Sequence, residues 1–286
     1  MAKLQQEANN ACDWLQDNIM CVAGHKSKLL VLGTKELKKT KCTGRELSIL
    51  VDGKLVTETQ SEKLLGVIIN NQMTWREHLY GETWRTGEDN SPGLTPQLSQ
   101  RLGILRKISG VASQKKLKMI AQGLFYSKLS YCLPLFANTW GLDHYRDQGT
   151  RFSSFTKEDN RKLQVIQNQV ARLTVDKREL QGKLNMPTKE LLLLSGDLSV
   201  HQLGAMSTVK LTKKIMMTQK PTYLSQRLQL SDDRGTRLGT TLTKDNSSLG
   251  LAREGFIYRG TKLFNLLPEY MKQESSMNKL KKMVKV

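Results

Sequence analysis

The start of the chain has apolar residues at the spacing of an α-helix. Leu4, Ala8, Ala11 and Leu15 fall on one side of such a helix, with Trp14 beside them. No Ser, Thr, Asp or Asn precedes this pattern as an N-cap. We therefore predict a helix already under way at Met1, as expected of a chain that starts inside an element of a larger domain.

Short apolar runs follow and predict β-strands, since they are rich in Leu, Val and Ile. The runs are residues 28–32, 46–51, 54–57 and 64–69. Asp52-Gly53 separates the second run from the third and is a dipeptide favoured in the type I′ turn of a β-hairpin. Together the runs predict a small, mostly antiparallel sheet with the first helix on one face.

Beyond residue 97 the pattern is helical almost throughout. Residues 80–97 are polar and contain several Gly and Pro, so we predict a linker there. The helical stripes that follow are Leu98, Leu102, Leu105 and Ile108; Leu117, Ile120, Leu124 and Leu129; and Leu163, Ile166, Val170 and Leu173. Residues 198–217 and 255–267 predict two further helices. The expected fold class is α+β, with domains at 1–79, 98–185 and 186–286.

The net charge of the chain indicates what kind of partner it binds. The 286 residues include 45 Lys plus Arg against 26 Asp plus Glu, a formal charge of +19, which indicates a polyanionic partner. Nucleic acid is the first candidate and a membrane surface the second. No run approaches the roughly 20 apolar residues that span a bilayer, and no signal segment opens the chain. We expect an intracellular protein, cytoplasmic or nuclear, that does not enter a membrane.

The basic residues are concentrated in one predicted helical pair that has no acidic residue. They are Arg101, Arg106, Lys107, Lys115, Lys116, Lys118 and Lys128. A helical pair of one sign suits a track of phosphates, because ordinary solvated helices interleave Glu with Lys. Phe125, Tyr126 and Tyr131 are able to stack on bases, but their helical spacing favours core packing. The Lys-rich tail from Lys272 to Val286 adds diffuse attraction or is simply a solvated terminus.

Neither metal nor catalytic chemistry is indicated by the titratable residues. Cys12, Cys21, Cys42 and Cys132 contain no C-x-x-C pair, and the four histidines are equally scattered, so we predict reduced cysteines and no metal site. Asp13 and Asp17 lie four apart on the first helix, where like charges face water. Asp232-Asp233, the only adjacent aspartates, are flanked by Ser and Arg and predict a loop.

Several segments also share their residues and their order with one known family. They are Trp14, Asn18 and Lys26-Ser27-Lys28 before Leu-Leu-Val-Leu; Leu64-Leu65-Gly66-Val67 with Trp75 and His78; Gly93 to Lys107; Leu129 to Phe136 with Trp140-Gly141; Asp197 to Leu203; and Arg259 to Pro268. This series resembles the end of the palm, the thumb and the C-terminal region of Jockey-like reverse transcriptases, which are RNA-directed DNA polymerases of non-LTR retrotransposons.

The resemblance assigns roles to the predicted domains. Residues 1–79 would be a truncated palm end, 98–185 the thumb and 186–286 the C-terminal region with its basic tail. Lys26 would lie near departing pyrophosphate, although it also suits a surface lysine before a strand. Leu65 and Gly66 would contact a primer strand, or form a packed strand with a glycine at a close approach.

The resemblance places the catalytic carboxylates outside this chain, because the family carries them upstream of the segments named above. Two-metal nucleotidyl transfer needs carboxylates that hold two Mg²⁺ ions. The resemblance therefore implies Mg²⁺ for the full-length polymerase but no cofactor for this chain, and the missing N-terminal polymerase half as a possible partner.

Three hypotheses follow. The chain is the C-terminal fragment of a reverse transcriptase that binds primer-template without synthesis. Alternatively it is a stand-alone basic module for RNA, RNA–DNA hybrid or DNA. As a third possibility it is a transposon remnant that folds poorly, because half a palm leaves a sheet edge unpaired.

Overall fold

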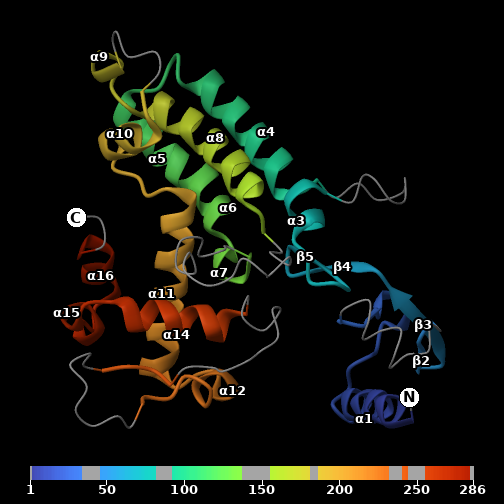
Figure 1. The fold of residues 1–286 in the computed structure, drawn as a ribbon. Helices are drawn as coiled ribbons and strands as arrows, with labels where there is room; N and C mark the ends of the chain where they lie inside the picture. Colours follow the sequence, from blue (N-terminus) through green and yellow to red (C-terminus); the bar gives the residue numbers. More distant parts are fainter. Residues whose placement is uncertain are drawn as a thin grey trace. The chain divides into compact units, whose positions relative to one another are not determined.

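The structure of the chain is a computed structural model, which describes residues 2–33, 46–81, 92–136, 155–180, 186–231, 240–243 and 255–283 (Figure 1). Predictions that involve Cys42, Trp140-Gly141, His144 and Asp232-Asp233 lie outside these residues. The chain forms two compact units, Met1–His78 and Leu79–Val286. The fold is mainly helical α+β, with its strands near the N-terminus. The assignment of these parts to palm and thumb stays a prediction.

The first unit contains a three-stranded sheet beside one long helix. Its elements are α1 (Ala2–Asp17), η1 (Gly24–Lys26), β1 (Leu29–Leu30), β2 (Ser48–Val51) and β3 (Lys54–Thr59). The predicted hairpin is confirmed, since β2 and β3 are antiparallel around Asp52 and Gly53, whose φ angles are 51° and 69°. The prediction of an antiparallel sheet is wrong for β1, which pairs parallel to β3. An apolar run predicts a strand but not its direction.

A side chain of α1 forms hydrogen bonds with the backbone of the edge strand of this sheet. The order is β1-β3-β2, so β2 lies at the edge. The Gln5 side chain accepts a hydrogen bond from the Leu50 backbone N–H and donates one to the Leu50 carbonyl, both at 2.8 Å. These bonds occupy backbone groups through which a further strand would pair. Leu29 and Val56 are the buried side chains of the sheet.

A second hairpin replaces the single strand predicted for residues 64–69. Its strands are β4 (Ser61–Leu64) and β5 (Val67–Asn70), joined by Leu65 and Gly66 with φ angles of 48° and 82°. The apolar run hid the turn because leucine rarely adopts a positive φ. Val67 and Ile68 are buried. The short helix α3 (Arg76–Tyr80) follows, and Nδ1 of its His78 accepts a hydrogen bond from the Ile68 backbone N–H.

The first part of the second unit is a bundle of long and short helices. They are α4 (Leu94–Ile108), α5 (Gln114–Ala121), the π-helical turn η2 (Gln122–Tyr126), α6 (Ser127–Ser130), α7 (Leu133–Phe136) and α8 (Lys157–Thr174). Most residues of the predicted stripes are buried, among them Leu98, Leu105, Leu129 and Leu163, each at 0% exposure. Helix α4 starts inside the predicted linker because Pro96, which lacks an N–H, is tolerated in a first helical turn.

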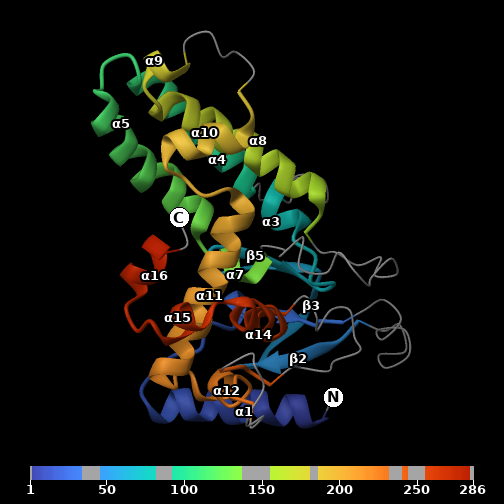
Figure 2. The ribbon, with the colours of Figure 1, turned by 60° about the vertical axis from the view of Figure 1, so that its left-hand side comes forward.

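Helix α11 (Val200–Thr218) connects this bundle to the C-terminal elements (Figure 2). The remaining helices are α9 (Lys177–Leu180), α10 (Thr188–Ser195), α12 (Thr222–Ser225), α14 (Phe256–Leu266), α15 (Glu269–Gln273) and α16 (Met277–Met283). The predicted helices at 198–217 and 255–267 are confirmed as α11 and α14. The two pack closely, because a Cβ on Gly260 would lie 2.5 Å from the Thr212 hydroxyl.

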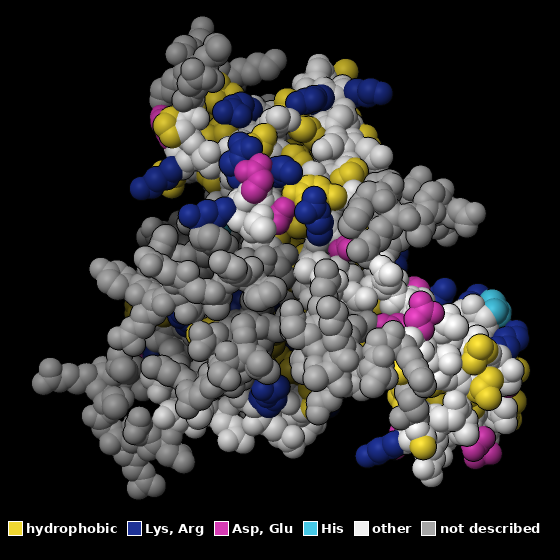
Figure 3. Space-filling view, turned by 45° about the vertical axis from the view of Figure 1, so that its right-hand side comes forward, with side chains coloured by type: hydrophobic (Ala, Val, Ile, Leu, Met, Phe, Trp, Pro, Cys, Tyr) yellow, Lys and Arg dark blue, Asp and Glu magenta, His cyan; other side chains and the backbone are white. Residues whose placement is uncertain are grey.

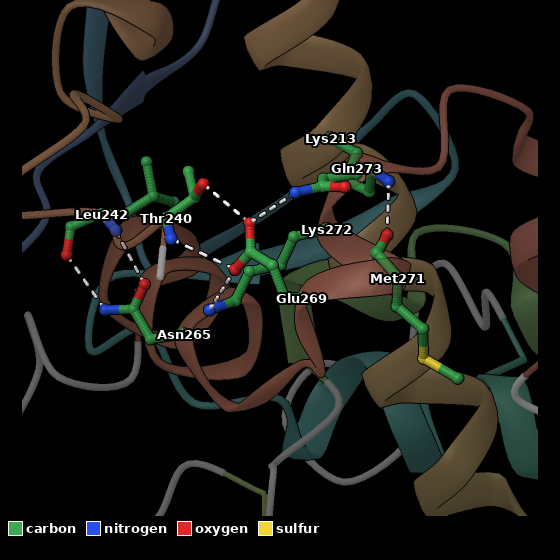
Figure 4. A network of polar contacts seen from close by, with 8 residues as sticks. All are labelled: Lys213, Thr240, Leu242, Asn265, Glu269, Met271, Lys272 and Gln273. Carbon is green, nitrogen blue, oxygen red and sulfur yellow. Dashed lines mark hydrogen bonds and ion pairs between the residues drawn. The ribbon is translucent and has the colours of Figure 1, made fainter. Parts of the chain in front are cut away.

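Polar contacts hold the C-terminal helices together (Figure 4). Glu269 accepts hydrogen bonds from the backbone and hydroxyl of Thr240, at 3.1 and 2.9 Å. Asn265 exchanges two hydrogen bonds with the Leu242 backbone. The Lys213 ammonium of α11 donates to the Met271 carbonyl at 2.7 Å, and burial lowers the pKa of this lysine. In the described residues no helix is long and apolar enough to cross a membrane.

Candidate nucleic-acid interface

Three of the seven predicted basic residues meet at one end of the α4–α5 pair. Lys107 lies in the last turn of α4, and Lys115 and Lys116 lie in the first turn of α5, with residues 109–113 forming the connection. All three side chains are exposed. None of the three ammonium groups makes a hydrogen bond or ion pair with another part of the described chain. Their charge is therefore available to a ligand.

Helix α8 is held against the same end of the bundle by two hydrogen bonds. The Arg106 guanidinium donates to Oε1 of Gln169 on α8 at 2.9 Å. Gln114, at the start of α5, donates to the Leu173 carbonyl at 3.0 Å, so the end of α8 is held against α5. Arg172 is exposed between these two positions along α8. We name this set, Arg106, Lys107, Lys115, Lys116 and Arg172, the α4–α5 corner.

Arg172 was missed in the sequence because it lies far along the chain from the basic helical pair. Its position on the polar side of the predicted stripe from Leu163 to Leu173 was the only available signal. Helix α8 packs against both α4 and α5, and this packing brings Arg172 close to the basic helical pair. The hydrophobic pattern along one helix does not predict which other helices it contacts.

Two other predicted residues use their donors inside the fold. The Arg101 guanidinium donates to the Leu124 carbonyl, and the Lys118 ammonium donates to the Ser195 carbonyl at the end of α10. Lys128, on α6, lies with its ammonium 5.9 Å from the centre of the Tyr131 ring. These three residues therefore join helices or contact a ring, and they lie along the bundle rather than at the α4–α5 corner. Nucleic-acid binding by them stays a prediction.

The electrostatics of this end of the bundle come from the basic helical pair and from Asp176, which follows the end of α8 and lies 3.8 Å from the Arg178 guanidinium. No acidic residue occurs between Leu94 and Phe136. Glu158 and Asp159 lie in the first turn of α8, about 20 Å from Arg172 at 1.5 Å per residue. The Arg161 guanidinium lies 2.8 Å from Glu158 and lowers the pKa of that carboxyl. Figure 3 shows several Lys and Arg side chains on the upper part of one face, with Asp and Glu side chains among them.

The aromatic residues of the helical pair are mostly part of the core, as their spacing predicts. Phe125 is fully buried and Tyr126 is 7% exposed. The Tyr126 hydroxyl donates to the Asp197 carboxylate at 2.7 Å, and burial, followed by that negative charge, raises the pKa of Tyr126. Phe125 and Tyr126 are therefore not placed to stack on a base, whereas Tyr131 is 45% exposed.

The first unit holds the residues that the family resemblance singled out. Lys26 lies on η1 with an exposed side chain, in front of β1. Leu65 and Gly66 form the tip of the β4–β5 hairpin, where Leu65 is 83% exposed. A primer contact through this tip, and a place for Lys26 near pyrophosphate, stay predictions.

The described residues include no group of three or more His, Cys, Asp or Glu that would hold a metal ion. Asp13 and Asp17 are both exposed on α1. Cys12, Cys21 and Cys132 are free thiols.

Comparison of the chain with models of protein families, with curated proteins and with solved structures found no match. The resemblance to reverse transcriptases of non-LTR retrotransposons, which the sequence motifs carry, is therefore not tested by these comparisons and stays a prediction.

Proposed function

We propose that the chain binds nucleic acid through the α4–α5 corner, as the C-terminal part of an RNA-directed DNA polymerase of a non-LTR retrotransposon. RNA, RNA–DNA hybrid and DNA are the candidate ligands. The observation that carries the binding proposal is the meeting of Lys107, Lys115 and Lys116, exposed and without internal partners in the described chain, in a stretch that has no acidic residue. The motif order supports the origin in a polymerase.

Lysine chemistry suits the nucleic-acid backbone rather than the bases. An ammonium group acts on phosphate as a compact point charge, and neutralising phosphates releases counterions. Such contacts position a duplex or a strand without reading its sequence. We therefore expect binding that depends steeply on salt and only weakly on base sequence.

Synthesis is not part of the proposed function of this chain alone. Two-metal transfer requires carboxylates around Mg²⁺, and the motifs matched here lie downstream of those carboxylates in the family. We expect no primer extension with Mg²⁺ or Mn²⁺ at any protein concentration. Extension by the purified chain would contradict this part of the proposal.

A stand-alone basic module is the second candidate. The helix caps of the second unit favour it over a remnant that folds poorly. Helices α8 and α11 both begin with a capping box, at Thr156 and Ser199. A module of this kind would bind single strands, duplexes and hybrids alike, whereas a thumb would prefer a primer-template hybrid. Equal affinity for all three ligands would favour the module.

The binding test replaces the three lysines together, as Lys107→Gln, Lys115→Gln and Lys116→Gln. The slope of log Kd against log salt, measured by fluorescence anisotropy on an RNA–DNA hybrid, should fall by about 1 for each phosphate that the variant no longer neutralises. The control carries Lys3→Gln, Lys54→Gln and Lys279→Gln, which remove the same charge at exposed positions elsewhere. Equal reductions of the slope in the two variants would show diffuse attraction and contradict a defined interface.

A further inference from the structure

A second stretch without acidic residues lies in the C-terminal part of the chain. Residues 198–231 include no Asp or Glu, and their basic side chains are Lys210, Lys213, Lys214, Lys220 and Arg227. The stretch covers α11 and α12, far along the chain from the α4–α5 corner. Its positive charge has no role in the function proposed above.

An open pocket of about 960 Å³ lies where α11 turns into α12. Gln219 makes the turn in the left-handed conformation, with a φ of 53°. The lining residues are Lys214, Thr218, Lys220, Pro221, Thr222, Tyr223 and Gln226. Volumes of about 300 to 1,000 Å³ are usual for ligand pockets, so the space is sufficient for a nucleotide.

The two lysines of the pocket have their ammonium groups available. Lys214 and Lys220 are exposed, and neither ammonium makes a hydrogen bond or ion pair within the described part of the chain. Lys213, next to Lys214, differs, because it is buried and donates to the Met271 carbonyl. One lysine of the adjacent pair therefore holds the fold together, and the other faces the pocket.

Tyr223 supplies an aromatic surface in the same pocket lining as these two lysines. It lies in α12 and is 68% exposed, whereas Phe125 and Tyr126 are buried in the bundle. A positively charged groove with an exposed aromatic ring is the usual arrangement for single-stranded nucleic acid, in which bases stack on the ring and lysines contact phosphates. A duplex would not offer a base to the ring, because its bases are already stacked on each other.

We propose that this pocket binds a nucleotide of single-stranded nucleic acid. A base stacks on Tyr223, and Lys214 and Lys220 contact the flanking phosphates. Gln226 has both a donor and an acceptor at the rim, so it accepts different bases. The site goes beyond the function proposed for the α4–α5 corner, and it requires neither a polymerase origin nor binding at that corner.

The pocket and the α4–α5 corner are separate places on the same unit. Helix α11 has 19 residues and therefore spans about 28 Å, and the pocket lies at its C-terminal end. Figure 1 shows α12 at the bottom of the helical part and the α4–α5 turn at its top. An oligonucleotide of about five residues is in the size range of one single-strand site.

The test uses the full chain and a fluorescein-labelled thymidylate oligonucleotide of about five residues. Tyr223→Ala should weaken its binding about tenfold, as expected when one base no longer stacks, while Tyr223→Phe should change it less than about twofold. Lys214→Gln with Lys220→Gln should flatten the salt dependence by about two phosphates. Tyr270→Ala, at a residue that is 60% exposed, and Lys189→Gln with Lys279→Gln are the matched controls.

Two further measurements separate stacking from simple charge attraction. An abasic oligonucleotide with the same phosphates should bind about tenfold more weakly than the thymidylate. Ultraviolet crosslinking with iododeoxyuridine should label Tyr223, also in the variant that lacks Lys107, Lys115 and Lys116. Absence of binding in the unmodified chain, equal affinity of the abasic probe, or an equal effect of Tyr223→Ala and Tyr270→Ala would overturn the proposal. Failure of the lysine test at the α4–α5 corner alone would leave it standing.

Discussion

At the scale of single residues, Leu65 shows how the backbone at a candidate site departs from what its side chain prefers. The residue has a φ of 48° in the two-residue turn between β4 and β5, and its side chain is 83% exposed. The left-handed conformation costs a leucine roughly 1–2 kcal/mol, whereas Asn and Gly adopt it readily. Because the Leu65 side chain is mostly exposed, its burial within the first unit offsets little of that cost.

Replacing Leu65 by Asn should therefore stabilise the first unit by about 1 kcal/mol, because Asn-Gly is the preferred type I′ turn. Urea unfolding followed by tryptophan fluorescence, which includes the buried Trp75, would measure the change. The control Leu64→Asn, at an exposed strand position with an ordinary φ, should bring no gain. A decrease in stability on Leu65→Asn would mean that the leucine side chain holds the hairpin together.

The residues at this turn also mark a limit of sequence reasoning. Asp52-Gly53 predicted its hairpin correctly, since both residues favour positive φ. Leu65-Gly66 forms the same kind of turn, but an apolar residue at its first position gave the run the appearance of one strand. The difference lies in the backbone conformation, which the hydrophobic pattern does not encode.

At the scale of elements, the π-helical turn η2 is joined to the segment before α11 by two hydrogen bonds to Asp197. The Tyr126 hydroxyl donates to Asp197 at 2.7 Å, and the Gln122 amide lies 3.3 Å from the same carboxylate. Single π-turns inside helices often occur at functional positions. Here the π-helical turn directs Tyr126 toward Asp197, which lies two residues before Ser199, the N-cap of α11.

Tyr126→Phe should cost about 2 kcal/mol at neutral pH, because the hydrogen bond to a charged group is removed. The raised pKa of Tyr126 makes this cost depend on pH. Above the ordinary value of 10.0 the unfolded phenol ionises while the folded one stays protonated, so its contribution to stability is lost as pH rises.

The stability difference between the unmodified chain and Tyr126→Phe should therefore shrink by about 1.4 kcal/mol per pH unit above pH 10. Urea unfolding of both proteins at a series of alkaline pH values measures it. A difference that is constant with pH would show that the Tyr126 proton is not held in the folded state.

Helices were the elements that sequence reasoning predicted best. The stripes along α4 and α8 are long, and each places several leucine, isoleucine or valine residues on one face. The direction of β1 was not predictable, because a strand of two residues carries no information about its partner. The start of α4 was misplaced by a proline that suits a first helical turn.

At the scale of the whole molecule, the sequence predicted the sign of the charge and the helices that carry it, but not which cations are available. Lys116 and Lys118 are two residues apart and both are exposed, yet of these two ammonium groups it is that of Lys118 that donates to a carbonyl of the described chain, that of Ser195, 77 residues away. Contacts at such separations follow from packing between helices, which periodicity along one helix does not reveal. The candidate site could therefore be predicted as a pair of helices and not as the α4–α5 corner.

Salt should affect the stability of the chain and its binding in opposite directions. A net charge of +19 disfavours the compact state through self-repulsion, which salt screens. Between about 50 and about 300 mM NaCl we expect the thermal unfolding midpoint to rise, while affinity for nucleic acid falls because counterion release is less favourable.

Circular dichroism melts and anisotropy titrations in the same buffers would measure both quantities. A midpoint that falls with salt would show that attractive ion pairs, rather than repulsion, dominate the folded state.

The carbonyl contacts of Arg101 and Lys118 bear on how quickly a polyanion reaches the protein. A carbonyl oxygen offers a partial negative charge but no net charge, so each cation is held in place without being neutralised. Both charges therefore still contribute to the long-range potential around the bundle. Such potentials raise association rate constants by about 10- to 1,000-fold at low ionic strength. Side chains that join the helices thus also help to steer a ligand toward them during diffusion.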